Sequence, residues 1–242
     1  MEETALATDA RPARSRFWQG VRLAWPVVIG YVPIGLAMGV LAGQTGLTPL
    51  ATGAMSALVY AGASQFVAVA MLQAGAPAVS IVLTTLFINL RHILMSAALS
   101  PFFRGVRPRM LWAIGFLVTD ETFAVSHGQF AAEGRGDPAV FTGLGLTAYV
   151  SWLASTVAGA WVGGALSTPE AWGLDFALPA MFIGLLAGQL KDRVGLAVAV
   201  LAALSAVGGG RFLGGWSVMA AAMLAAAAGV VMRRWTARTP SS

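Results

Sequence analysis

The chain has 242 residues, of which only 10% are charged and 57% are hydrophobic. Soluble domains carry roughly a quarter charged residues, so this composition excludes a soluble enzyme and a disordered chain, and the absence of cysteine excludes a disulfide scaffold. We predict an all-α, polytopic membrane protein, a helical bundle of about seven or eight transmembrane segments with some broken or short helices. The net charge of +5 does not indicate a nucleic-acid partner, because the basic residues stand in small clusters between apolar runs.

Three regions follow one another along the chain. Residues 1–22 are polar with charges of both signs, and we predict a disordered cytoplasmic tail there. Residues 23–232 form the predicted transmembrane domain, and residues 233–242 form a basic tail. A spanning helix needs about 20 apolar residues, and turn-forming residues divide the apolar runs. The predicted spans are 25–43, 49–72, 78–101, 110–128, 140–166, 176–190, 194–208 and 213–232.

The basic residues predict which end of the bundle faces the cytoplasm. With eight crossings and a cytoplasmic N-terminus, ten basic residues lie inside and four lie outside. The basic loop at 104–109 then lies outside, as an exception to the rule. The segments 176–190 and 194–208 are short for full spans, and a re-entrant hairpin there would reduce the crossings to seven or six.

Two acidic residues, Asp120 and Glu121, lie near the middle of the fourth predicted span. Each acid at mid-bilayer costs roughly 2.5–3.5 kcal/mol on insertion scales, so packing alone does not account for the two together. Neighbouring helix positions differ in direction by about 100°. We therefore expect the two carboxylates to have different partners, one in a cavity and the other on a neighbouring helix.

Asn89, Arg91 and His92 lie in the middle of the third predicted span. Arg91 keeps its charge at any accessible pH, and at this depth its side chain cannot easily extend to water. We expect it to form an ion pair with Asp120 or Glu121. Histidine ordinarily titrates near neutral pH, so His92 is a candidate for proton transfer as well as for plain hydrogen bonding.

The second predicted span contains the stretch from Tyr60 to Phe66, with Gly62, Ser64 and Gln65 in mid-span. These residues weaken a helix and expose backbone groups, which is tolerated in a membrane only where the break lines a cavity or is buried in protein. A half-helix that begins near Ser64 would offer free N–H groups to an anion. Packing of small residues between helices is the alternative explanation.

Three stretches, in this order, carry a resemblance to a known family: YAGASQF at residues 60–66, the pair Arg91-His92, and TDETF, which begins at Thr119. Over roughly residues 17–232 the chain resembles the AzlC/YgaZ family. The resemblance implies the large subunit of an exporter of leucine, isoleucine, valine and often methionine, located in the bacterial inner membrane and driven by protons. It also implies a small hydrophobic partner subunit of the AzlD/YgaH type.

A branched-chain amino acid is a zwitterion with an apolar tail, so its site needs an anion binder, a cation binder and an apolar wall. We expect Arg91 or the break at 62–65 to bind the α-carboxylate. Asp120 or Glu121 is expected to bind the α-ammonium group or to carry the coupling proton. The expected apolar wall consists of Phe66, Phe87 and Phe123.

Two other functions stay open at this point. One is an intramembrane hydrolase that uses His92 or His127 together with Ser96 or Ser126, because His92 and Ser96 share one helix face. The other is a non-transporting membrane subunit or a channel component. We predict no enzymatic activity, no cofactor and no metal site, since the chain lacks the nucleotide-binding, zinc-helix and nucleophile-elbow motifs.

Overall fold

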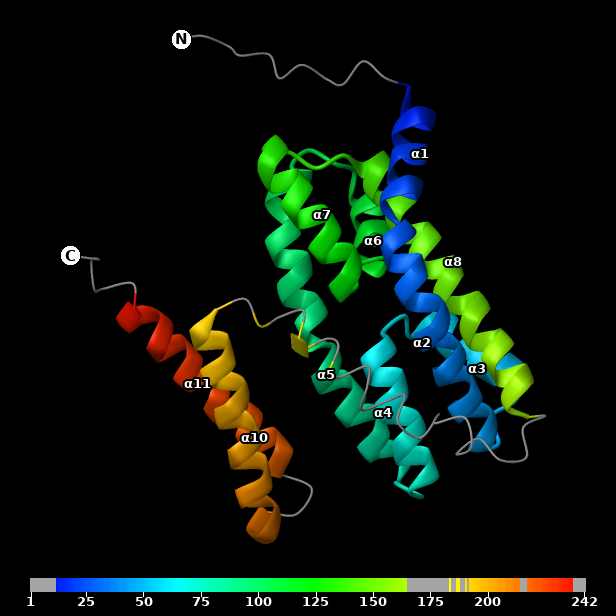
Figure 1. The fold of residues 1–242 in the computed structure, drawn as a ribbon. Coiled ribbons are helices and arrows are strands. Elements are labelled where there is room, and N and C mark those ends of the chain that lie inside the picture. The colour runs from blue at the N-terminus through cyan, green and yellow to red at the C-terminus, as the bar shows by residue number, and fades with distance from the viewer. Residues whose placement is uncertain are drawn as a thin grey trace. The chain divides into compact units, whose positions relative to one another are not determined.

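The computed structural model describes residues 12–164, 192–213 and 217–236, and positions 183, 186, 187 and 190. All elements in these residues are helical, which confirms the predicted fold class. The chain divides into two compact units, residues 1–178 and 179–242, and each unit is described by itself. The predicted span at 176–190 lies almost wholly outside the described residues. Figure 1 shows the helices of both units.

Three long helices form the frame of the N-terminal unit: α2 (Trp25–Gln44), α5 (Ala78–Leu99) and α8 (Pro138–Gly163). Their bounds agree closely with the spans predicted at 25–43, 78–101 and 140–166. In the described residues, four helical segments are long and apolar enough to cross a membrane, three in this unit and Arg193–Gly210 in the other. The sequence therefore places the long helices correctly.

Helices α2 and α8 pack through small residues. A side chain at Gly39 would collide with the backbone of α8 at Thr156 and Ala160, and one at Gly159 would collide with Leu36 of α2. Small residues let two helix backbones approach closely, which is the common way in which helices associate inside a membrane. This seam joins the first and last long helices of the unit.

Residues 13–22, for which we predicted a disordered tail, are instead helical. They form most of α1 (Ala13–Leu23), which leads into α2 and packs on the start of α8. Gly20 and Gly143 allow this contact, because a side chain at either would meet backbone of the other helix. The Nη1 atom of Arg16 lies 2.6 Å from Oδ2 of Asp137, the residue that caps α8. The polar composition of this stretch therefore reflects the end of a helix and not disorder.

The segment 49–72, predicted as one span, is a hairpin of two half-helices. Helix α3 (Pro49–Leu58) ends at Val59, and α4 (Gly62–Gln73) begins after Ala61. Gln65 of α4 donates a hydrogen bond of 2.9 Å to Ser56 of α3, so the chain has turned back at Tyr60. We call this segment hairpin 1.

The segment 108–133 forms a second hairpin, which we call hairpin 2. Helix α6 (Pro108–Phe116) follows the short helix η1 (Ser100–Phe103), and α7 (Asp120–Glu133) returns to the same end. A backbone hydrogen bond of 2.8 Å from Gly136 to Phe102 fixes the two ends of the hairpin near each other. The predicted span at 110–128 is thus also divided, at residues 117–119.

The two hairpins enter the unit from opposite ends, since α5 runs between the end of hairpin 1 and the start of hairpin 2 (Figure 1). A helix followed by a hairpin therefore occurs twice with opposite orientation, first as α2 with hairpin 1 and then as α5 with hairpin 2. Inverted repeats with interrupted helices are typical of secondary transporters. Each hairpin returns to the end from which it started, so neither adds a crossing.

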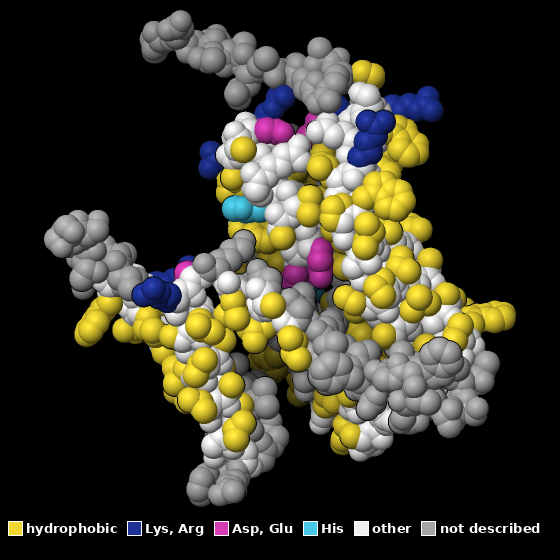
Figure 2. Space-filling view, in the orientation of Figure 1, with side chains coloured by type: hydrophobic (Ala, Val, Ile, Leu, Met, Phe, Trp, Pro, Cys, Tyr) yellow, Lys and Arg dark blue, Asp and Glu magenta, His cyan; other side chains and the backbone are white. Residues whose placement is uncertain are grey.

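This topology changes the expected distribution of charge. The basic loop at 104–109 lies at the same end as α1, not at the opposite end as predicted, because hairpin 1 does not cross. Figure 2 shows basic side chains gathered at that end of the unit. The connections at the other end, residues 45–48 and 74–77, contain no charged residue.

In the C-terminal unit, α10 (Arg193–Leu213) packs against α11 (Ser217–Thr236). Gly229 allows the close contact, because a side chain there would meet Val198. These helices agree with the spans predicted at 194–208 and 213–232.

Candidate functional site

The tips of the two hairpins meet beside α5. The ring of Tyr60, at the tip of hairpin 1, lies 6.3 Å from the ring of Phe116, at the end of α6. Tyr60 also contacts Tyr149 of α8 and Tyr31 of α2, at 5.1 and 6.5 Å between ring centroids. Side chains from all three long helices and both hairpins therefore converge at one depth.

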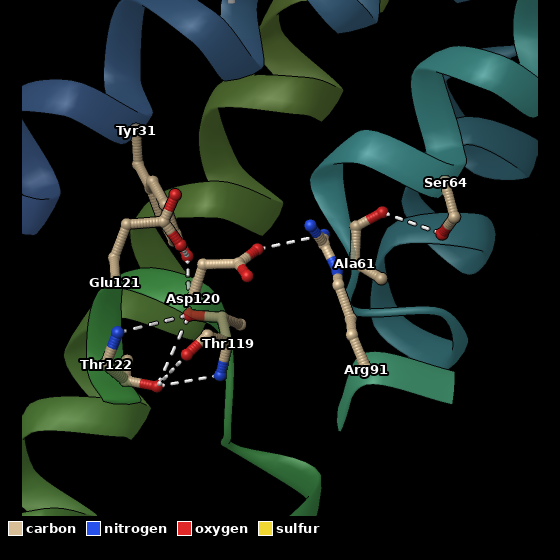
Figure 3. A network of polar contacts seen from close by, with 8 residues as sticks. All are labelled: Tyr31, Ala61, Ser64, Arg91, Thr119, Asp120, Glu121 and Thr122. Carbon is tan, nitrogen blue, oxygen red and sulfur yellow. Dashed lines mark hydrogen bonds and ion pairs between the residues drawn. The ribbon is translucent and has the colours of Figure 1, made fainter. Parts of the chain in front are cut away.

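Arg91 and Asp120 form an ion pair at this point, as we expected for Arg91. The distance from Nη2 of Arg91 to Oδ2 of Asp120 is 2.9 Å, and the two side chains are 32% and 28% exposed. Figure 3 shows the two side chains reaching toward each other, one from α5 and one from the start of α7. The ion pair is therefore formed, but its two side chains are only partly buried within this unit.

Glu121 points away from Arg91, toward α2, so the two acids have different partners as predicted. The hydroxyl of Tyr31 donates a hydrogen bond of 2.6 Å to Oε2 of Glu121. The same hydroxyl lies 2.8 Å from the hydroxyl of Thr119. Tyr31, which we did not single out from the sequence, thus connects α2 to Thr119 and Glu121 at the tip of hairpin 2 (Figure 3).

The two acids lie in the first turn of a helix and not at mid-helix as predicted. The Thr119 hydroxyl accepts from the Thr122 backbone N–H at 3.3 Å, and the Thr122 hydroxyl accepts from the Thr119 N–H at 2.8 Å. This reciprocal capping ends the preceding segment and starts α7. Acidic side chains are favoured in the first turn of a helix, where the unpaired N–H groups point.

The helix break predicted around Gly62, Ser64 and Gln65 is confirmed, with α4 beginning at Gly62. The polar side chains at this break form hydrogen bonds that stabilise hairpin 1. Ser64 donates to the carbonyl of Ala61 at 2.9 Å, and Gln65 accepts from Nε1 of Trp152 at 2.7 Å in addition to its bond to Ser56. A side chain at Gly62 would press on the Trp152 ring. Gln65 and Ser64 thus fix hairpin 1 against α8.

Within the part of the chain that the structure describes, four buried polar atoms near the meeting point have no hydrogen-bond partner: the Tyr60 hydroxyl, Oδ1 of Asn89, Nε of Arg91 and Nε2 of His92. Tyr60 is only 7% exposed. Buried polar groups are almost always paired, and each exception calls for a reason. A polar ligand that binds between hairpin 1 and α5 would supply partners for such groups.

The phenylalanines that we expected to form one apolar wall are dispersed. Phe66 is buried within α4, while Phe87 is 55% exposed. Phe123 packs on His127, with ring centroids 5.0 Å apart. A mostly apolar groove lies instead between α5 and α6, and His92, Trp112 and Phe116 help to line it.

The serine–histidine pairs considered for hydrolysis are not assembled as catalytic pairs. Ser126 donates to the carbonyl of Thr122 at 2.7 Å, and His127 stacks on Phe102 and Phe123. Nε2 of His92 has no hydrogen-bond partner, so it is not bonded to Ser96. In the described part of the chain, no group of three histidine, cysteine or acidic residues could hold a metal ion.

Comparison with known proteins identifies relatives over most of the chain. A family model described as AzlC protein matches residues 26–166. The inner membrane protein YgaZ of Escherichia coli is 34% identical over 81% of this chain and 83% of its own length. An uncharacterized membrane protein of Archaeoglobus fulgidus is 31% identical over 73% of this chain and 77% of its own. The branched-chain amino acid transport protein AzlC of Bacillus subtilis is 27% identical, over 83% and 82%. No solved structure matches this chain.

Proposed function

This chain belongs to the AzlC family, and on that premise we propose that it transports branched-chain amino acids across the bacterial inner membrane. The observation that carries the proposal is the Arg91–Asp120 ion pair, located where the two hairpins meet and surrounded by unpartnered polar atoms. The name of the Bacillus subtilis relative supports the substrate class. The substrates we propose are leucine, isoleucine, valine and methionine.

The ion pair suits a zwitterion because the amino acid can insert between its two members. The α-carboxylate takes the place of Asp120 beside Arg91, and the α-ammonium group takes the place of Arg91 beside Asp120. Each of the four charges has a partner after this exchange, so none is left unpaired, which matters because an unpaired charge inside a membrane is costly. The hydroxyl of Tyr60 and the amide of Asn89 would supply further polar contacts.

Glu121 is the residue we propose for the coupling proton. It is hydrogen-bonded to Tyr31 and has no cationic partner among the described ion pairs. Arg91 compensates the charge of Asp120, and for this reason we propose Glu121 and not Asp120 as the proton carrier. Because Asp120 and Glu121 are neighbours, protonation of Glu121 lowers the negative charge beside the substrate and couples the two binding events.

The N-terminal end of the unit is proposed to face the cytoplasm, and net flux to run outward. The basic loop at 104–109 lies at the same end as α1, and the two described connections at the other end, residues 45–48 and 74–77, carry no charge. Basic residues favour the cytoplasmic side. A small hydrophobic subunit of the AzlD/YgaH type is the proposed partner.

Counterflow of labelled leucine into liposomes that contain the purified protein tests this function. Two preparations are compared, one that contains the small subunit and one that lacks it. In at least one of them, we expect labelled leucine to accumulate only when unlabelled leucine is inside. A channel component would give leucine equilibration without counterflow, and a non-transporting subunit would give neither. Either result in both preparations would overturn the proposal.

Asp120→Asn and Glu121→Gln separate the two proposed roles. Asp120→Asn should abolish counterflow, while Glu121→Gln should retain counterflow and lose transport driven by a pH gradient. The matched control is Asp137→Asn, because Asp137 also forms an ion pair with an arginine, at 2.6 Å, but at the end of the bundle. Full pH-driven activity in both Asp120→Asn and Glu121→Gln would contradict the mechanism.

A further inference from the structure

A groove of about 600 Å³ runs between α5 and α6. Its lining includes His92 and Ser96 from α5, and Leu111, Trp112, Gly115 and Phe116 from α6. The lining is mostly apolar, with two polar residues on the α5 side. A volume of this size falls within the range of small-molecule sites, which are typically apolar with a few polar groups.

The groove reaches the point where the hairpins meet, because Phe116 of its lining lies 6.3 Å from Tyr60 between ring centroids. Its lining also adjoins the ion pair along the chain: His92 follows Arg91 in α5, and Phe116 is the last residue of α6, four positions before Asp120. Among the described residues, Nε2 of His92 is buried and has no hydrogen-bond partner, so this polar atom of the lining is available to a ligand.

We propose that this groove holds the aliphatic side chain of the amino acid whose α-groups bind Arg91 and Asp120. The inference rests on the proposed function and adds what determines the substrate specificity. Arg91 and Asp120 bind the α-carboxylate and α-ammonium groups, which all amino acids share, and the groove receives the side chain, which differs among them. The apolar lining favours leucine, isoleucine, valine and methionine over amino acids with charged or short side chains.

Gly115 sets the size limit of the groove in this proposal. A Cβ atom built at Gly115 meets no atom within 4 Å, so a larger side chain enters the groove without displacing a neighbour. Most glycines of α2 and α8 are different, because a side chain there collides with a facing helix. Glycine at position 115 is therefore not required by packing, and its absence of a side chain leaves space in the groove.

Gly115→Leu fills this space and is the variant that tests the proposal. Counterflow of labelled leucine and of labelled alanine is measured in liposomes for the wild type, Gly115→Leu and Gly128→Leu. Gly128 is the matched control, because it also lies in a helix of hairpin 2 and has no atom within 4 Å of a built Cβ, but it does not line the groove. Removing room for one or two methylene groups changes discrimination by about 10–200-fold.

We expect Gly115→Leu to lower the leucine-to-alanine ratio at least tenfold while alanine counterflow continues, and Gly128→Leu to keep the wild-type ratio. An unchanged ratio in Gly115→Leu would overturn the groove as the subsite. Loss of both substrates in a folded Gly115→Leu protein would also overturn it, and would instead indicate that the groove receives a helix of a partner subunit. If the wild type itself transports neither amino acid, the proposed function fails and not merely the subsite.

A labelling experiment tests the same subsite without transport. The chain has no cysteine, so Gly115→Cys provides a single reactive thiol in an otherwise unreactive protein. Saturating leucine should slow the reaction of this thiol with a small maleimide at least fivefold, whereas saturating glycine should leave the rate nearly unchanged. Equal protection by glycine and leucine, or no protection by leucine at concentrations that saturate binding, would contradict occupancy of the groove by the side chain.

Discussion

Arg91 and Asp120 form an ion pair of 2.9 Å between the middle of α5 and the first turn of α7. The pair joins the central long helix to the tip of hairpin 2, directly beside the tip of hairpin 1. The second half-helix of hairpin 2, α7, begins at this pair, and that of hairpin 1, α4, begins at the tip of its own hairpin.

We expect the pair to contribute more to function than to stability. Replacement of an ion pair by apolar residues of similar size is often neutral or stabilising, whereas removal of one partner costs about 3–5 kcal/mol at buried sites and less at this partly exposed one. The double variant Arg91→Met/Asp120→Leu should therefore unfold within a few degrees of the wild type in detergent. Leucine counterflow should be lost in the double variant. Transport by a stable double variant would contradict the role of the pair.

Tyr31 is expected to be a positioning residue for Glu121. Tyr31→Phe removes the hydrogen bond of 2.6 Å to Glu121 and leaves the ring packing in place. We expect leucine counterflow to continue and transport driven by a pH gradient to fall about tenfold, because the orientation of the proton carrier is lost. Tyr149→Phe is the control, since its hydroxyl donates to the backbone carbonyl of Ala57, at 3.2 Å, and not to an acid among the described residues. Equal losses in both variants would indicate a general packing effect.

Gln65 is expected to hold hairpin 1 in place. Gln65→Ala leaves Nε1 of Trp152 and the hydroxyl of Ser56 without this partner inside the protein. An unsatisfied buried group costs about 1–3 kcal/mol, so the midpoint of thermal unfolding should fall by several degrees. Gln129→Ala, at an exposed pair with Glu133, should leave it unchanged. An unchanged midpoint in Gln65→Ala would show that the network does not anchor the hairpin.

The seam between α2 and α8 is expected to be intolerant of side chains. Gly39→Ala places a methyl group against the backbone of α8, and overpacking of this kind costs about 1–3 kcal/mol. Gly30→Ala in the same helix meets no atom within 4 Å and should be neutral or slightly stabilising. Thermal unfolding of the two variants measures the difference. Equal stability of both would show that the helices are not packed as described.

The hairpin topology can be tested by labelling from one side of the membrane. Cysteines placed at Ser15 and Arg107 should both react with a membrane-impermeant reagent from the cytoplasmic side, and one at Ala76 should react from the opposite side. If the second predicted span crossed the membrane, positions 15 and 107 would react from opposite sides. That result would contradict the assignment of residues 49–73 as hairpin 1.

The long helices and the main ion pair were predictable, but the hairpins were not. The apolar run from Leu23 to Leu90 contains no charge, so hydropathy finds the helices but cannot tell a span from a segment that turns back at Tyr60. A turn inside the membrane has the same apolar composition as a crossing. The basic loop at 104–109 disagreed with the predicted orientation. It was the one indication in the sequence that the predicted number of crossings was too high by one.

The start of α7 was also predictable in principle. Thr119 and Thr122 bracket the two acids in the spacing of a capping box, with threonine where glutamate or glutamine is usual. Tyr31 could not have been found from the sequence, because its role depends on which helix faces Glu121. The helix break at Gly62 was found because three weak helix formers gather there.

Binding of labelled leucine to the purified protein tests the central claim most directly. The wild type and Asp137→Asn should bind leucine with equal affinity, and Asp120→Asn should lose at least 100-fold. 4-Methylpentanoate, which lacks the α-ammonium group, should not compete with leucine for the wild type. Undiminished leucine binding by Asp120→Asn, or full competition by 4-methylpentanoate, would contradict the insertion of a zwitterion into the Arg91–Asp120 pair.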